Sequence, residues 1–314
     1  MSAQPGAVSV GRTGRAAAAP RGKKVLSERA RSERRLGWLL CAPAALIMAL
    51  VAGYPIVYSL WLSVQRYDLR FPDAHEFVGL QNYVTVLTSS LWWQDVFHTL
   101  IITVFSVSLE LVLGMAIALV MHRAIFGRGA VRAAVLIPYG IITVVASLAW
   151  KYAWAADTGF VPSLLGLDYD PLTRPTTSYV VIILTEVWKT TPFMALLLLA
   201  GLALVPDELH EAAKVDGANA VQRFFRITIP LMKPAILVAL LFRALDAFRV
   251  FDSVFILTNG ANKTEPVSLL GYNQLLNRLN MGLGSAVSVL IFVCVAIIAV
   301  LFLKGFGAAQ QERR

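Results

Sequence analysis

Six long apolar runs alternate with polar segments along this chain of 314 residues. About 20 apolar residues in a helix suffice to cross the hydrocarbon core of a bilayer. In lipid a helix satisfies its backbone hydrogen bonds internally, so the pattern predicts an all-α integral membrane protein with six transmembrane helices. The third run is the shortest and contains Pro138. The runs cover, approximately, residues 36–64, 96–121, 133–150, 179–205, 235–257 and 281–303.

The polar segment between the fourth and fifth runs, residues 206–234, has a helical pattern of its own. Asp207 can cap a first short helix by accepting a hydrogen bond from an early N–H group. Leu209, Ala212 and Ala213 follow the spacing that places residues on one helix face. Gly217 comes next, where a residue in the left-handed conformation would end the helix.

A second short helix is predicted after Gly217. Asn219 can cap it, and its apolar residues are Val221, Phe224 and Phe225. We expect Pro230 and Pro234 to end this helix, with Pro234 in the first turn of the next span. A short helix with a small-residue face suits close approach to a groove on another protein. The alternative is a segment that lies in the lipid headgroup layer.

The composition supports a membrane protein. Hydrophobic residues make up 57% of the chain and charged residues 15%, whereas soluble proteins have about 45–50% and about 25%. Both cysteines, Cys41 and Cys294, fall inside apolar runs. They are expected to act as small hydrophobic side chains, with no disulfide framework.

The distribution of basic residues predicts the orientation. If the amino end is inside the cell, 19 of the 28 Lys and Arg residues lie in cytoplasmic segments and six in outer segments. An excess of Lys and Arg is typical of the cytoplasmic side. We therefore expect both termini and residues 206–234 in the cytoplasm, at the plasma membrane. Residues 1–35 would be a basic tail, disordered in residues 1–24, residues 36–304 the six-helix domain, and residues 305–314 a second tail.

A basic tail can also indicate a nucleic-acid partner. Next to a membrane span, however, such a tail more often holds that end of the chain in the cytoplasm. We therefore expect membrane lipid and no nucleic acid among the partners.

Four charged residues recur at every third position of the fifth run: Arg243, Asp246, Arg249 and Asp252. On one helix they would follow one face, and each would have an opposite charge one turn away. A charge in lipid is costly, so this ladder must face other helices or a water-filled path. Two interpretations stay open, a translocation pathway that contacts the substrate and a structural ion-pair network.

Three further charges lie within predicted spans: Glu110, Glu186 and Lys189. Glu110 can pair across helices with Arg243 or Arg249. Glu186 and Lys189 are one turn apart and can neutralise each other. The nearby aromatic residues Trp150, Trp188 and Phe248 can stack on a sugar ring or simply pack in the membrane. The candidate pathway residues are Glu110, Trp188, Lys189, Arg243, Asp246, Arg249 and Asp252.

The sequence contains no phosphate-binding G-x-x-x-x-G-K-[ST] motif, no metal-ligand cluster and no plausible Ser/His/Asp set. It predicts a chain that is not an enzyme and binds no metal or cofactor. A gradient-driven carrier with Glu110, Asp246 and Lys189 as ion sites is one alternative, although no inverted repeat is evident. A membrane enzyme or lipid flippase subunit would need a reactive constellation that the sequence lacks.

The polar segment carries a specific motif. Glu211-Ala212-Ala213 is followed after three residues by Gly217, and after nine more by Ile227-Thr228-Ile229-Pro230. This resembles the E-A-A-x3-G-x9-I-x-L-P coupling motif of bacterial ABC-importer permeases, with Ile229 in place of Leu. Residues 77–83 (FVGLQNY) and the regions of residues 187–189 and 251–252 resemble the carbohydrate-uptake branch. Residues 121–123, 136–140 and 188–194 resemble permeases of actinobacterial trehalose importers.

The resemblance implies the type I importer permease fold, with a cytoplasmic coupling helix and a disaccharide or oligosaccharide, trehalose above all, as the substrate. Maltose-type oligosaccharides and glycerol phosphate are the other substrates it suggests. It implies a second permease subunit, an ATPase dimer that uses ATP and Mg²⁺, and an extracellular solute-binding lipoprotein. The residues it assigns to coupling are Glu211, Ala212, Ala213, Asp216, Gly217, Ile227 and Pro230.

Overall fold

A computed structural model describes residues 28–123 and 128–311 of the chain. The predicted disorder of residues 1–24 and the last three residues of the carboxyl tail lie outside the described residues. The chain divides into two compact units, Met1–Pro55 and Ile56–Arg314, and each is described by itself.

The first apolar run is helical. It begins in α1 (Glu28–Met48), continues through the π-turn η1 (Ala49–Gly53) and ends in α2 (Tyr54–Ser63). The 29 residues Arg35–Ser63 are long and apolar enough to cross a membrane, as predicted.

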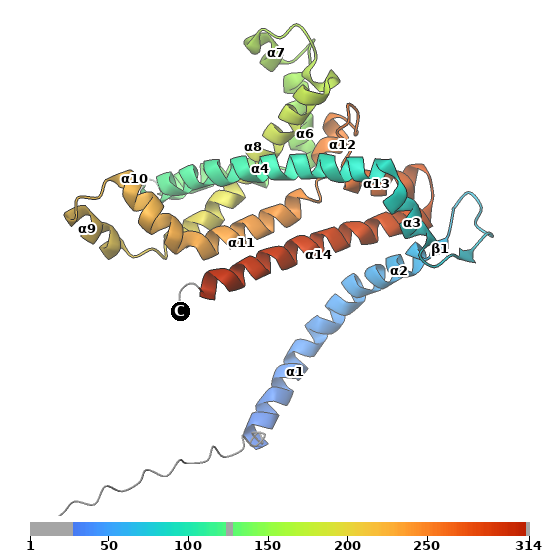
Figure 1. Cartoon of the computed structure of the whole chain (residues 1–314), viewed down its shortest axis with the longest axis horizontal. Coiled ribbons are helices and arrows are strands. Elements are labelled where there is room, and N and C mark those ends of the chain that lie inside the picture. The colour runs from blue at the N-terminus through green and yellow to red at the C-terminus, as the bar shows by residue number, and fades with distance from the viewer. Residues whose placement is uncertain (1–27, 124–127, 312–314) are drawn as a thin grey trace, which may run out of the picture. The chain divides into compact units, whose positions relative to one another are not determined.

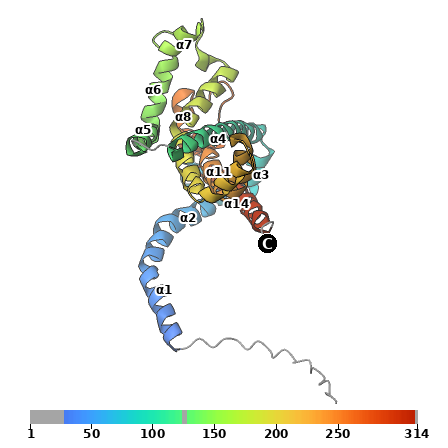
Figure 2. The ribbon, with the colours of Figure 1, turned by 90° about the vertical axis from the view of Figure 1, so that its left-hand side faces the viewer.

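Four long helices form the body of the second unit (Figures 1 and 2). Helix α8 packs against α4, and α11 contacts α4, α8 and α14. In the most apolar window of each helix, 50% of α8 is buried but only 11% of α14. Helix α8 is therefore central, and α14 leaves most of its apolar surface for lipid to cover. The bounds are α4 (Ser90–Arg123), α8 (Pro175–Leu202), α11 (Ile229–Ala247) and α14 (Met281–Gln311).

Short elements connect these helices. One polar connection contains a two-stranded antiparallel hairpin, which the all-helical prediction did not include. The short elements are β1 (Gln65–Arg66), β2 (Glu76–Phe77), α3 (Gln81–Thr88), α7 (Phe160–Leu165), η2 (Pro171–Thr173), α9 (Asp207–Val215), α10 (Ala220–Arg223), η3 (Phe224–Thr228), α12 (Asp252–Leu257), α13 (Val267–Tyr272) and η4 (Asn273–Asn277).

The third predicted span is not one helix. It consists of α5 (Arg128–Gly140) and α6 (Thr143–Trp154), which meet at an angle of 85°. Pro138 lacks an N–H group and weakens the last turn of α5. Ile142 then has extended backbone angles (φ −58°, ψ 133°) and starts α6. Among the described residues, five helices can cross a membrane, or six if α5 and α6 are one broken span.

The prediction that Pro230 and Pro234 end a helix is wrong. Helices α10 and α11, with the π-turn η3 between them, form a continuous stretch of 28 residues, Ala220–Ala247. The π-turn already interrupts the regular hydrogen bonding, and Pro230 follows it in the first turn of α11. A missing N–H group is tolerated at such a position.

Two glycines allow the central helices to approach closely. A Cβ atom at Gly201 of α8 would lie 2.3 Å from the Cβ of Ala235 on α11. A Cβ atom at Gly114 of α4 would lie 2.9 Å from the Cγ of Met194 on α8. Small residues at such positions are typical of helix packing in membranes.

Candidate functional site

The candidate coupling segment is a helix-turn-helix formed by α9 and α10. Pro206 occupies the capping position of α9, and no side-chain hydrogen bond caps the helix. The expectation that Asp207 caps it is therefore wrong, because the helix begins one residue earlier than the pattern suggested. Asp207 and Glu208 lie in the first turn instead, where a carboxylate stabilises the positive end of the helix dipole.

Gly217 ends α9 as predicted. Its φ angle is +82°, in the left-handed region that favours glycine. The N–H of Gly217 donates to the carbonyl of Lys214 at 3.0 Å, and the N–H of Ala218 to that of Ala213 at 2.9 Å. Asn219 then caps α10 in a reciprocal pair with Gln222, at 2.8 and 2.9 Å. The local turn chemistry of this segment follows from its sequence.

The outer face of this segment is exposed and partly apolar. No residue of α9 is buried, and Glu211, Ala212 and Asp216 are exposed. The exposed fractions of Val215, Val221 and Phe225 are 89%, 65% and 64%. Apolar side chains gathered on a polar connection suit a protein partner. The geometry therefore offers a surface on which a protein partner can dock.

The inner face of the segment is held by His210, which the sequence analysis did not single out. Its ring Nε2 lies 3.5 Å from the hydroxyl of Thr228, and its carbonyl lies 3.5 Å from Nη1 of Arg223. Ile227 is half-buried in η3, and Pro230 is exposed at the start of α11. No sequence motif marks His210, because its partners belong to a different helix.

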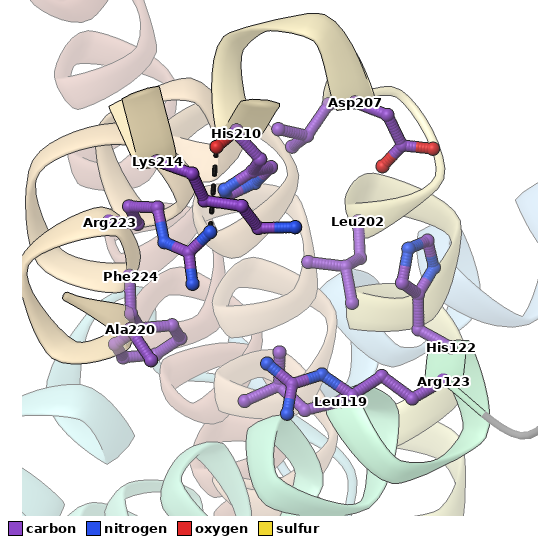
Figure 3. A pocket seen from close by; sticks show the side chains of 11 residues that line it. Leu119, His122, Arg123, Leu202, Asp207, His210, Lys214, Ala220, Arg223 and Phe224 are labelled. Carbon is purple, nitrogen blue, oxygen red and sulfur yellow. Dashed lines mark hydrogen bonds between the residues drawn. The ribbon is translucent and has the colours of Figure 1, made fainter. Parts of the chain in front are cut away.

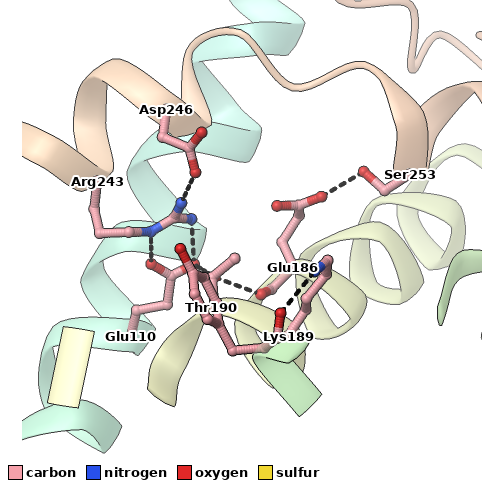
Figure 4. Close-up of polar contacts among 8 residues, drawn as sticks. Glu110, Glu186, Lys189, Thr190, Arg243, Asp246 and Ser253 are labelled. Carbon is pink, nitrogen blue, oxygen red and sulfur yellow. Dashed lines mark hydrogen bonds and ion pairs between the residues drawn. The ribbon is translucent and has the colours of Figure 1, made fainter. Parts of the chain in front are cut away.

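A buried ion pair joins α4 to α11 (Figure 4). The guanidinium of Arg243 donates to both carboxylate oxygens of Glu110, at 2.6 and 2.8 Å. The two side chains are 1% and 0% exposed. Thr190 on α8 donates to the same carboxylate at 2.7 Å, and Arg243 also pairs with Asp246. The expected pairing of Glu110 with Arg243 across helices is confirmed.

Glu186 and Lys189 do not neutralise each other, contrary to the prediction. The Lys189 ammonium donates to the carbonyl of Ile141 at 2.9 Å, and the hydroxyl of Ser253 donates to Glu186. The break between α5 and α6 leaves carbonyl groups without helical partners, and such groups attract a cation. Lys189 therefore turns toward the break instead of toward Glu186.

The predicted charge ladder also does not continue along one helix. Helix α11 ends at Ala247, so Arg249 lies in the following turn and Asp252 begins α12. In the described part of the chain, the ladder forms one ion pair, between Arg243 and Asp246. Arg249 and Asp252 are exposed.

These residues surround a cavity of about 410 Å³ between α6, α8, α11 and α12. Four candidate pathway residues line it: Lys189, Asp246, Arg249 and Asp252. Glu110 and Arg243 do not line it and are buried. The sequence analysis missed Tyr139, Thr143, Thr190 and Phe251 in the wall, and Glu186 also lies there.

Trp188 lies outside this cavity. Its ring is 6.0 Å from that of Trp150, and both line a separate apolar cavity of about 350 Å³ with Trp154 and Phe160. Phe248 is buried in the core with an exposed fraction of 2%, so it is not available to a substrate. No group of three His, Cys, Asp or Glu residues in residues 28–123 and 128–311 could hold a metal ion.

Comparison with known proteins gives consistent matches. Residues 82–313 match the family described as "Binding-protein-dependent transport system inner membrane component". The chain is 57% identical over 278 residues to the trehalose transport system permease protein SugA of Mycobacterium tuberculosis, covering 88% of this chain and 91% of that protein. It is 40% identical to the trehalose/maltose transport system permease protein MalF of Thermococcus litoralis, covering 87% and 94%.

Among solved structures, a chain of a bacterial ABC transporter that imports the polysaccharide alginate superposes with a TM-score of 0.74. The identity is 23%, and the match covers 90% of this chain and 99% of that chain. At this identity the likeness concerns the fold.

Proposed function

Because this chain belongs to the family of inner-membrane components of binding-protein-dependent transport systems, we propose that it is one permease subunit of an ATP-driven importer of trehalose. Its fold is that of type I ABC importer permeases. The observation that carries the proposal is the 57% identity, over nearly the whole chain, to a trehalose permease. The helical membrane architecture and the polar cavity agree with it.

The cavity of about 410 Å³ suits a sugar. A disaccharide is neutral and rich in hydroxyl groups, so it needs hydrogen-bond donors, acceptors and flat apolar faces. The wall offers the carboxylates of Asp246 and Asp252, the cations Lys189 and Arg249, and the rings of Tyr139 and Phe251. Asp252 and Arg249 make no ion pair within the described residues, so their polar atoms are free to bind hydroxyl groups.

The buried pair Glu110–Arg243 has a different role in this proposal. It is closed to solvent and holds α4 and α11 together beside the cavity. Arg243 presents Asp246 toward the cavity by pairing with it. The Glu110–Arg243 pair thus stabilises the helices beside the cavity, whereas Asp246, Arg249 and Asp252 contact the substrate.

Coupling to ATP would occur through α9. With the amino terminus inside the cell, as the basic residues predict, the segment of residues 206–234 is cytoplasmic. Glu211 would contact the groove of an ATPase subunit, the small side chains of Ala212 and Ala213 would permit close packing, and Gly217 makes the turn. Closure of the ATPase dimer on ATP and Mg²⁺ would move this helix and tilt the membrane helices.

The family implies three partners: a second permease subunit, an ATPase dimer and an extracellular solute-binding lipoprotein. The wide exposed apolar surface of α14 leaves room for the second permease and for lipid. The ATP chemistry belongs to the ATPase subunits, because the chain has no phosphate-binding loop of its own.

The test is uptake of labelled trehalose by cells that lack this gene and by the same cells with the gene restored. We expect uptake only with the gene, and competition by unlabelled trehalose but weak competition by maltose and glucose. Unchanged uptake in the deletion strain would refute the trehalose assignment. Uptake that survives loss of the ATPase but stops with a protonophore would instead favour a gradient-driven carrier.

A further inference from the structure

A second cavity of about 410 Å³ lies behind the coupling segment (Figure 3). It is open to solvent and is lined by the ends of α4 and α8 and by α9 and α10. Three cationic side chains from three different helices extend toward it: Arg123 from α4, Lys214 from α9 and Arg223 from α10. His122 and His210 also line it. This concentration of basic groups plays no part in the proposed coupling or sugar pathway.

Within residues 28–123 and 128–311, no ion pair compensates the positive charges in this cavity. Asp207 is the one carboxylate among the described residues of the wall, and none of these ion pairs connects it to the three cations. Nε of Arg223 is buried without a hydrogen-bond partner. Its Nη1 reaches only the carbonyl of His210, at a long 3.5 Å. The charge of Arg223 is therefore poorly satisfied, and an anion that binds its terminal nitrogens would compensate it.

The chemistry of the wall favours a phosphate group. Guanidinium and ammonium groups that approach from several directions match the tetrahedral oxygens of phosphate, and Arg can bind it through two parallel N–H groups. The wall also contains the apolar side chains of Leu119, Leu202 and Phe224. An amphipathic ligand with a phosphate head and a less polar body fits this arrangement.

We propose that this cavity binds the phosphate group of a small ligand, either the headgroup of an anionic lipid or a soluble phosphate ester. The bound phosphate bridges Lys214 on α9 and Arg223 on α10 to Arg123 on α4. Helix α9 has no buried residue of its own, so this bridge fastens the coupling segment to the membrane helices. This phosphate site does not depend on the identity of the transported sugar.

The experiment uses the full-length chain in lipid nanodiscs, together with the subunits that copurify with it. In one arm the lipid is phosphatidylcholine and inorganic phosphate is titrated, with sodium chloride of equal ionic strength as the reference. In the other arm phosphatidylglycerol replaces part of the lipid and no phosphate is added. Thermal unfolding gives the apparent affinity, and native mass spectrometry counts retained lipid. The test variants are Lys214→Gln and the double variant Lys214→Gln with Arg223→Gln; Arg226→Gln, an exposed residue outside the cavity, is the matched control.

We expect stabilisation of the wild type and of Arg226→Gln by phosphate or by phosphatidylglycerol. Binding should weaken roughly tenfold or more in both test variants, which corresponds to about 1.4 kcal/mol per factor of ten. Stabilisation in the lipid arm alone identifies a headgroup, and stabilisation in the phosphate arm identifies a soluble ester. Absence of stabilisation in both arms would overturn the proposal, as would equal affinities of Lys214→Gln and Arg226→Gln. Because Lys214 is exposed, its variant tests the site even if the double variant does not fold.

Discussion

The ammonium of Lys189 lies 2.9 Å from the carbonyl oxygen of Ile141, at the break between α5 and α6. A second carbonyl at the break, that of Tyr139, is 3.5 Å from the same nitrogen. Lys189 is 9% exposed and lies on the central helix α8. Lys189 thus donates to carbonyl groups that lost their helical partners at the break. This explains why a charged residue lies within a predicted span.

Substitution of Lys189 by Met should destabilise the protein, because the carbonyl groups of Tyr139 and Ile141 lose their charged donor. A hydrogen bond to a charged group contributes about 1.5–3 kcal/mol. We expect a loss of that size in the free energy of unfolding, measured with denaturant in detergent. Lys304→Met, an exposed residue near the end of α14, is the control and should change little. Equal stability of the two variants would contradict the assigned role.

The Glu110–Arg243 pair should behave as one unit in a double-mutant cycle. Removing one member of a buried ion pair costs roughly 3–5 kcal/mol, because the other charge stays buried without its partner. Glu110→Gln and Arg243→Met should each show a loss of this order in the unfolding free energy. The double variant should lose much less than the sum. Additive losses would mean that the two side chains act independently.

Gly217 gives a conformational test of the coupling segment. At its φ of +82° an ordinary L-residue is unfavourable by about 1–2 kcal/mol, whereas Asn tolerates the left-handed region. Gly217→Asn should keep most trehalose uptake, and Gly217→Val should lose most of it while membrane insertion is unchanged. Uptake assays together with a membrane-fraction immunoblot separate the two effects. Full activity of Gly217→Val would remove the turn from the coupling mechanism.

A substitution of Asp252 tests whether the cavity that it lines binds the substrate. We expect Asp252→Asn to raise the KM for trehalose uptake by up to about tenfold, since one hydrogen bond contributes about 0.5–1.5 kcal/mol. Its thermal stability should stay near wild type, because Asp252 is exposed and makes no ion pair within the described residues. Asp157→Asn, an exposed residue outside the cavity, is the matched variant. An unchanged KM for Asp252→Asn would place the sugar elsewhere.

In the connection between β1 and β2, the carboxyl group of Asp68 should stay ionised at an unusually low pH. Hydrogen bonds from Arg70 lower the pKa of Asp68 from its ordinary 3.8 to about 2. A lowered carboxylate pKa stabilises the folded state above pH 3.8, and this contribution is lost as the pH falls toward 2. Carbon-13 NMR of the Asp68 carboxyl should therefore give a midpoint near 2 in the wild type and a higher one in Arg70→Gln. The same midpoint in both would contradict the pairing.

Features set by short-range chemistry were predictable from the sequence. The turn at Gly217 and the cap at Asn219 depend on neighbouring residues only, and both were predicted. The all-α membrane fold was also predicted, because long apolar runs have few other solutions. Of the six predicted spans, five are single helices among the described residues, and the third is the bent pair α5 and α6. The family resemblance, carried by the spacing of Glu211, Gly217 and Pro230, is confirmed by the comparisons.

Features set by distant contacts were not predictable in this way. The carbonyl of Ile141 at the break between α5 and α6 accepts a hydrogen bond from Lys189, which lies 48 residues later in the chain. The helical pattern gave no sign that α11 ends at Ala247, so the charges at Arg249 and Asp252 were placed on the wrong element. Tyr139, in the last turn of α5, and Phe251, in the turn before α12, line the same cavity although they lie far apart in the sequence.

The contact at Gly201 has a mechanical consequence. A Cβ atom there would lie only 2.3 Å from that of Ala235, so α8 and α11 touch almost backbone to backbone at this point. Such a close contact can serve as a pivot about which α8 and α11 tilt against each other. Gly201 lies at the end of α8 that leads to α9. Lys189 lies about 18 Å from Gly201 along α8, at 1.5 Å per residue. If α8 tilts about this contact, a small displacement of α9 becomes a larger displacement of Lys189 in the wall of the cavity between α8 and α11.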